Sequence, residues 1–158
     1  MAIVTTRRNY AKALNPGIKS LNFLNNILAK MEAKKSGAYE ALMLNYRGFL
    51  TEGTVSNIFY FSNRTLYTPS IATGILGGIT RRIILDSARE MNLKTREGSF
   101  RKEDIYRADE VFLTNTTMEV MPVACIDSKK IRNSPGKLSK RLHEVYRKKI
   151  DEYIRING

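Results

Sequence analysis

The sequence is poor in the residues that mark secreted, membrane-spanning or metal-binding proteins. Its 158 residues include one cysteine, one histidine and no tryptophan. No apolar run approaches the roughly 20 residues of a membrane span, and Met1 to Tyr10 is basic, without the apolar stretch of a signal peptide. Cys125 has no internal disulfide partner, and its apolar neighbours predict a small buried side chain in a reducing compartment. We therefore expect a cytoplasmic protein without a membrane partner.

Acidic residues are also scarce, so the formal net charge is +12. A basic chain can bind nucleic acid, an anionic membrane surface or phosphorylated small molecules. The densest basic segment is the expected last helix, with Lys137, Lys140, Arg141, Arg147, Lys148 and Lys149. Tyr146 is the one aromatic residue among them, too few for a base-stacking platform. We expect a solvated helix face, no nucleic-acid partner, a surface position for His143, and neither a metal site nor a catalytic triad.

Hydrophobic periodicity predicts one α/β domain over residues 1–158, with many short strands and three main helices. Apolar residues recur at three- and four-residue spacing within 21–35, after Gly77-Gly78, and after Pro135-Gly136. Short apolar runs bounded by turn residues predict strands at 2–7, 41–44, 49–52, 57–61, 65–68, 94–97, 110–114 and 121–126, and 102–106 fits one helical turn. We find no internal repeat or interdomain linker.

Four small groups of residues are candidates for a functional site, and each also has a plain structural explanation. Lys19 lies between Ile18 and Leu21, and an apolar setting would favour the uncharged amine that a Schiff base needs, although most lysines are solvated. Glu52 follows a strand and is either a turn residue or the partner of a protonated ring nitrogen. Gly77 to Arg81 opens a helix whose free amides suit an anion, but glycines also begin helices for geometric reasons. Thr114 to Thr117 is a plain turn or a second wall of the same anion site.

Together and in this order, the four groups resemble the class IV (fold-type IV) pyridoxal-5′-phosphate (PLP) aminotransferases. That family includes D-amino-acid and branched-chain aminotransferases and aminodeoxychorismate lyase. The resemblance covers nearly the whole chain. The matching stretches are Ile18-Lys19-Ser20-Leu21-Asn22, Gly48 to Asn57, Leu66-Tyr67-Thr68-Pro69, Gly78-Ile79-Thr80-Arg81, Ala108-Asp109-Glu110-Val111-Phe112, Thr116 to Val123, and Ile126-Asp127.

The resemblance implies a mixed sheet or pseudo-barrel flanked by about three main helices, and it assigns roles by position. Lys19 would form the Schiff base, and Glu52 would hydrogen-bond the pyridine nitrogen. The cofactor phosphate would meet the amides of Ile79 and Thr80 and the hydroxyl of Thr116, with Asn57 and Leu76 completing the cofactor site. Thr117 and Met118 would bind the substrate carboxylate. The residues Asn22-Phe23-Leu24 after the lysine are closer to the D-amino-acid aminotransferase and lyase pattern than to the branched-chain one.

The expected function is amino-group transfer between an amino acid, D- or branched-chain L-, and a 2-oxo acid. Family members are typically homodimers, and they carry an N-terminal small domain, which supplies an arginine to the phosphate. We expect this small domain to be absent here, so that the chain is the large domain alone. One alternative is a PLP-dependent lyase. Another is a non-catalytic protein that binds phosphate or nucleic acid, although such a protein needs neither Lys19 nor Glu52.

Overall fold

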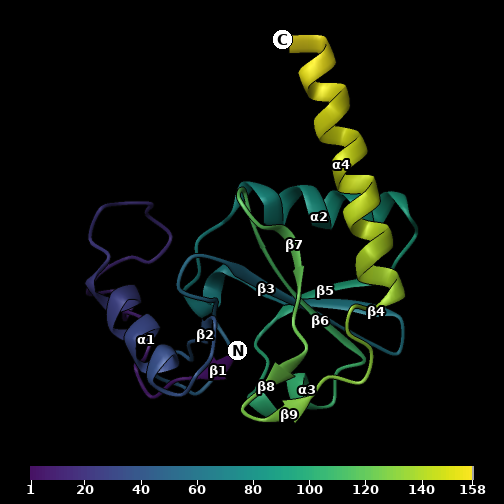
Figure 1. Ribbon diagram of the computed structural model, residues 1–158. Coiled ribbons are helices and arrows are strands. Elements are labelled where there is room, and N and C mark those ends of the chain that lie inside the picture. The colour runs from purple at the N-terminus through teal and green to yellow at the C-terminus, as the bar shows by residue number, and fades with distance from the viewer. Residues whose placement is uncertain (158) are drawn as a thin grey trace.

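The computed structural model describes residues 1–157 and centres on a five-stranded sheet (Figure 1). Its strands are β3 (Asn57–Ser62), β4 (Thr65–Pro69), β5 (Thr95–Gly98), β6 (Glu110–Asn115) and β7 (Glu119–Pro122). They lie in the order β5-β4-β3-β6-β7, and the β4–β5 pair is parallel while the other three pairs are antiparallel. The mixed sheet and its helices confirm the expected α/β class.

Four α-helices and a short 3-10 helix accompany the sheet. They are α1 (Leu24–Lys35), η1 (Ile71–Thr73), α2 (Ile79–Glu90), α3 (Lys102–Tyr106) and α4 (Lys137–Asn157). Figure 1 shows α2 lying along the sheet and the C-terminal part of α4 extending away from the rest of the chain. Within residues 1–157, no helix is long and apolar enough to cross a membrane.

Two small sheets complete the fold, and several of the expected strands are shortened or divided. Of the strands expected at 41–44 and 49–52, only Ala41–Leu42 forms, with a single bridge between Leu44 and Leu50. β1 (Ala2–Ile3) pairs in parallel with β2 (Ala41–Leu42), and β8 (Cys125–Ile126) pairs with β9 (Lys129–Lys130). The strand expected at 2–7 stops at Ile3. The Val4 amide still donates to the Leu42 carbonyl, but the amides of Thr5 and Thr6 donate to the carboxylate of Glu32 instead of a strand. The strand expected at 121–126 is divided between β7 and β8, and Cys125 is half-buried where a buried side chain was expected.

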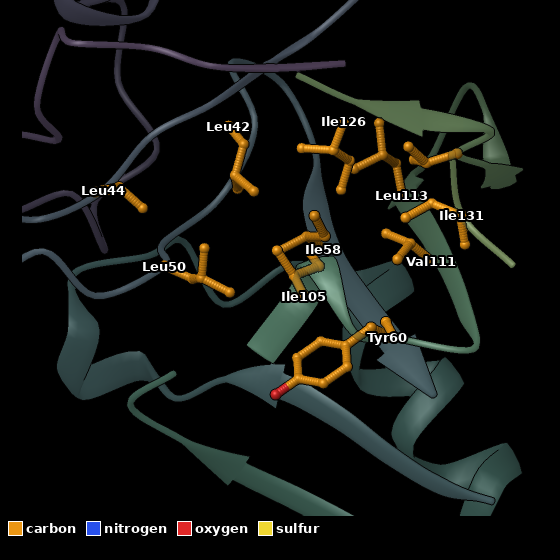
Figure 2. Close-up of a cluster of buried hydrophobic side chains, with 12 residues drawn as sticks. Leu42, Leu44, Leu50, Ile58, Tyr60, Ile105, Val111, Leu113, Ile126 and Ile131 are labelled. Carbon is orange, nitrogen blue, oxygen red and sulfur yellow. The ribbon is translucent and has the colours of Figure 1, made fainter. Parts of the chain in front are cut away.

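Residues alternate along the central strands between two separate cores, as the two-residue period of a strand requires. On one face, Ile58 and Tyr60 of β3 join Val111 and Leu113 of β6. Figure 2 shows this cluster, in which side chains from β2, α3 and the segments after β7 also meet. The remaining buried members of the cluster are Leu42, Leu44, Leu50, Ile105, Ala108, Val123, Ile126 and Ile131.

The opposite face of the sheet packs against α2 and α4. Phe59 of β3 and Phe112 of β6 stack with ring centroids 5.2 Å apart. Ile84 of α2 and Leu142 of α4 cover this aromatic pair, and both are fully buried. The sheet is thus apolar on both faces, which leaves polar chemistry to the ends of its strands.

Helix α1 forms where expected, but its apolar residues face away from the rest of the chain. Ala29 and Ala33 are completely buried against Val4, Ala41 and Met43. The larger side chains that predicted the helix are exposed by about half or more: Leu24, Ile27, Leu28 and Met31. The small alanines let the helix approach β2 closely, and an apolar stripe is left on its outer side.

Candidate functional site

One pocket of about 360 Å³ brings together most of the side chains that the sequence singled out. Lys19, Glu52, Asn57 and Leu76 line it, and so do Ile79, Thr80 and Thr116. Thr117 and Met118, expected near a substrate carboxylate, are on the same turn as Thr116 but do not line the pocket. The lining residues come from segments up to about one hundred positions apart, which the ends of β3 and β6 and the start of α2 bring together.

Glu52 is the buried acid of this pocket, with only 5% of its surface exposed. Its Oε1 lies 2.8 Å from Nη2 of Arg8, and its Oε2 accepts hydrogen bonds from Asn57 Nδ2 (3.2 Å) and the Leu76 amide (3.0 Å). Burial raises the pKa of Glu52 to about 7, against the opposing effects of the Arg8 charge and the Leu76 amide. The carboxyl group is therefore poised to gain or lose a proton near neutral pH.

Arg8 is a site residue that no pattern in the sequence marks. It is 9% exposed and lines the pocket beside Glu52. Its Nη1 donates to Asn26 Oδ1 of α1 at 2.9 Å, and Asn26 Nδ2 donates in turn to the carbonyl of Thr54. A single arginine in the polar segment Arg7-Arg8-Asn9 has no distinguishing pattern, so only the fold identifies it as the partner of Glu52.

The start of α2 presents backbone amides to the pocket. Gly78 is the N-cap residue, with no side-chain hydrogen bond to the first turn, so the amides of Ile79 and Thr80 have no acceptor within the helix. Gly78 lies so close to Asn57 that an added Cβ would come within 2.3 Å of its Oδ1. The glycine is therefore needed for this close approach, which lets Asn57 Nδ2 bind both Glu52 and the Leu76 carbonyl.

The turn between β6 and β7 supplies hydroxyl groups from the other side. Thr116 is exposed and lines the pocket, and Asn115 Nδ2 ties the turn to the carbonyl of Val55 at 3.1 Å. Thr114, which the sequence placed only in a general hydroxyl run, also lines the pocket. Its Oγ1 is buried without a hydrogen-bond partner in the described part of the chain. A buried hydroxyl of this kind is costly unless another group pairs with it.

Lys19 lines the pocket, but the apolar setting expected for it is absent. Lys19 is exposed, and its neighbours Ile18 and Leu21 are 65% and 101% exposed. The segment before α1 is held by local contacts, such as the bond from the Gly17 amide to Asn15 Oδ1. No other element of the described chain packs over Ile18 and Leu21, which is why burial does not follow from their apolar character.

His143 lies at the surface, as expected, with 35% of its side chain exposed, but it is paired with an acidic residue. Its Nε2 lies 2.6 Å from Oε2 of Glu119, which begins β7 next to the hydroxyl turn. The last helix is thus connected to the wall of the pocket.

Comparison with known proteins decides the family. The family model described as amino-transferase class IV matches residues 1–126. The chain belongs to this family. A putative branched-chain-amino-acid aminotransferase of Methanocaldococcus jannaschii is 41% identical over 145 residues, covering 91% of this chain and 50% of the relative. Aminodeoxychorismate lyase of Bacillus subtilis is 33% identical over 99% of this chain and 53% of its own length, and D-alanine aminotransferase of Bacillus licheniformis is 40% identical over 84% and 47%.

Solved class IV structures share the fold. The branched-chain amino acid aminotransferase of Thermobaculum terrenum, in its PLP form, superposes with a TM-score of 0.90 and 37% identity. That match covers 92% of this chain and 48% of the other. The chain therefore spans about half the length of the relatives that it matches.

The residues of the class IV pocket fit the family's cofactor. PLP presents a phosphate, a pyridine nitrogen, a phenolic oxygen and an aldehyde. For the phosphate, the pocket offers the free amides of Ile79 and Thr80 at a helix start. It also offers the buried carboxyl group of Glu52, the primary amine of Lys19 and the hydroxyl of Thr114, which has no partner in the described part of the chain. A volume of about 360 Å³ lies within the usual range of roughly 300–1,000 Å³ for small-molecule sites.

Proposed function

We propose that this chain is the PLP-binding domain of a class IV aminotransferase and that Lys19 is its covalent anchor for the cofactor. The observation that carries the proposal is one pocket shared by an amine, a buried carboxyl group and a helix start, in Lys19, Glu52 and the first turn of α2. A plain phosphate-binding site has no use for a buried carboxyl group, which would repel the anion. The class IV relatives support the same reading.

Each group of the pocket has a distinct task in this proposal. When bound, PLP supplies an electron sink that stabilises negative charge on the substrate carbon. Lys19 would hold the cofactor through Nζ and, when that nitrogen is free, would move a proton during amino transfer. Glu52 would keep the pyridine nitrogen protonated. The Ile79 and Thr80 amides, with the hydroxyl of Thr116, hold the phosphate at the positive end of the α2 dipole.

The substrate contacts belong to the same proposal. We assign the substrate carboxylate to the backbone at Thr117 and Met118, beyond the edge of the present pocket. The Met118 amide donates to Asn115 Oδ1 at 2.6 Å, which fixes the turn next to Thr116, so a substrate carboxylate would have to replace Asn115 at that amide. Side-chain specificity, D- or branched-chain L-, is open between the two kinds of relative.

Borohydride trapping tests the covalent anchor. PLP is added to the chain, absorbance is recorded, and borohydride reduces any carbon–nitrogen double bond before peptide mapping. We expect the label on the peptide that contains Lys19 and its loss in Lys19→Ala. Lys12→Ala is the matched control, since Lys12 is an exposed lysine of the same segment outside the pocket lining. A label spread over surface lysines would refute the assignment.

Lyase chemistry is the second candidate, because the B. subtilis lyase matches 99% of this chain. The two reactions differ in their products, so one assay separates them. The protein that contains this chain is incubated with PLP and either D- or L-amino acids plus a 2-oxo acid, or aminodeoxychorismate alone. Release of pyruvate from aminodeoxychorismate without an amino acceptor would establish the lyase, and formation of a new amino acid would establish the transaminase.

We also propose that the protein is a cytoplasmic homodimer in which the outer face of α1 contacts the second copy. Leu24, Ile27, Leu28 and Met31 form an apolar stripe at helical spacing, each about half exposed or more. Burying such a stripe against its symmetry mate removes apolar area from water. Sedimentation should show a dimer that Ile27→Glu dissociates, while Lys34→Glu on the same helix leaves it intact. Equal sedimentation of the two variants would reject this interface.

A further inference from the structure

The strand that follows the turn between β6 and β7 begins with a left-handed backbone. Asn115 and Glu119 are paired across the hairpin, so Thr116, Thr117 and Met118 form a three-residue loop. In loops of this length the last loop residue, usually glycine or asparagine, has a left-handed backbone. Here the left-handed residue is instead Glu119, the first residue of β7, with φ of 55°. This backbone costs free energy for a residue with a side chain, and contacts of the Glu119 carboxylate can offset that cost.

Two side chains of α4 hold that carboxylate. His143 Nε2 lies 2.6 Å from Glu119 Oε2, and Arg147 Nη2 lies 3.3 Å from Glu119 Oε1. His143 and Arg147 are four residues apart, so both face the hairpin from the same side of the helix. The Glu119 and His143 side chains are only 26% and 35% exposed, which limits screening of their contact by water. Arg147 is 63% exposed and therefore adds less.

The helix behind these contacts is firmly anchored. Glu110 of β6 accepts hydrogen bonds from the amides of Leu138 and Ser139 at its start, at 3.1 and 2.8 Å. Leu142 and Tyr146, on either side of His143, are buried in the core beneath the sheet. Because α4 is fixed at these points, the contact between His143 and Glu119 restrains the turn as well.

We propose that Glu119, His143 and Arg147 form a clamp that positions the Thr116–Met118 turn at the pocket. The inference rests on the proposed function, in which this turn meets the cofactor phosphate and the substrate carboxylate. None of the three residues lines the pocket, so they are positioning residues that act through Thr116 and the Met118 amide. The clamp gives the last helix, distant from the pocket in sequence, a part in ligand binding.

The test compares His143→Leu with His143→Gln, which can still donate to Glu119, and with Lys140→Leu as a control on an exposed position of the same helix. Hydrogen exchange of the peptide spanning the turn is followed by mass spectrometry. We expect several-fold faster exchange at Met118 in His143→Leu, recovery in His143→Gln, and no change in Lys140→Leu. Glu119→Asn is the second variant, since asparagine suits the left-handed backbone but is too short to reach α4. It should also exchange faster, whereas a turn governed only by backbone strain would become more protected.

Cofactor affinity gives an independent measurement. The dissociation constants of PLP and of pyridoxal, which lacks the phosphate, are compared in the same variants. Loosening Thr116 should weaken PLP binding roughly three- to tenfold, the effect of impairing about one hydrogen bond, and leave pyridoxal unchanged. The clamp would be overturned if His143→Leu and Glu119→Asn had the same exchange rates and PLP affinities as the control. A wild-type chain that binds no PLP at Lys19 would instead refute the proposed function, and the exchange rates alone would then decide the clamp.

Discussion

Replacing Gly78 by alanine should damage the pocket far more than the same change one residue earlier. An added Cβ at position 78 would lie 2.3 Å from Asn57 Oδ1, so the Asn57 side chain has to move. An amide flip brings no relief, because Nδ2 would then occupy the same place. Moving the side chain breaks its bonds to the Leu76 carbonyl (2.9 Å) and to Glu52 Oε2 (3.2 Å). Gly78 has φ −63° and ψ 143°, which alanine adopts freely, so the backbone itself contributes no penalty.

The magnitude follows from the two bonds. A neutral hydrogen bond contributes about 0.5–1.5 kcal/mol and one to a charged group about 1.5–3 kcal/mol, which together give about 2–4.5 kcal/mol for Gly78→Ala. At about 2–4 °C per kcal/mol for a chain of this size, the melting temperature should fall by about 4–18 °C. At Gly77 the nearest atom to an added Cβ is Ile71 Cδ1 at 3.5 Å, an ordinary contact. Gly77→Ala should therefore be neutral or stabilise by up to about 1 kcal/mol through the unfolded chain.

Urea unfolding at pH 8 measures both variants in the chain without cofactor. The midpoints should separate while the slopes stay equal, which indicates that the same surface is exposed on unfolding. PLP affinity should fall with Gly78→Ala as well, because Asn57 no longer orients Glu52. Equal midpoints for the two alanine variants would show that Asn57 relocates without loss, and the reasoning about this close contact would be wrong.

The remaining predictions concern charge. Burial raises the pKa of Glu52 from 4.5 to about 7, so the folded chain binds more protons than the unfolded chain between these values. Stability from this group is therefore full below about pH 4.5 and is lost as the pH rises through 7, and Glu52→Gln should flatten that decline in pH-dependent urea unfolding. Arg8→Met removes the charge that opposes the shift, so the decline in stability should extend to higher pH. A decline that ends at the same pH as in the wild type would exclude Arg8 as the opposing charge. At Glu32, burial alone would raise the pKa, but hydrogen bonds from the Thr5 and Thr6 backbone and side chains outweigh it and lower the pKa to about 2. Its contribution is present above about 4.5 and is lost toward pH 2, so Glu32→Gln should be less acid-sensitive than the wild type, and an unchanged acid transition would argue against these bonds.

Local patterns predicted the framework well because they depend on neighbours in sequence. The short apolar run from Ile58 to Phe61, bounded by turn residues, predicted a strand, and the two faces of β3 bury its alternate residues in separate cores. Gly77 and Gly78 predicted the start of α2 within one residue. Periodicity could not say which side of α1 meets the fold, since an apolar stripe indicates burial only when another surface covers it.

Such local patterns could not predict contacts between segments that are distant in the sequence. Arg8 and Glu52 are separated by 44 positions and Glu119 and His143 by 24, and neither pair has a spacing that marks it. The expectation for Lys19 was wrong in its surroundings because flanking apolar residues do not create an apolar environment by themselves. The environment comes from other elements that pack over the segment, and none of those described here does so.

The Arg8–Glu52 pair also explains why a carboxyl group can remain useful in so enclosed a place. Burial alone would keep Glu52 neutral, and a neutral acid attracts a cationic ring nitrogen weakly. Arg8, whose Nη2 lies 2.8 Å from Glu52 Oε1, opposes this effect, and its Nη1 is held in place by a hydrogen bond to Asn26 of α1. The balance leaves the pKa of Glu52 at about 7, where one further positive charge at Oε2 is enough to favour the ionised form. When a protonated ring binds, Glu52 should therefore release its proton and form an ion pair with the ring nitrogen. The proposed cofactor requires this behaviour of its acidic partner.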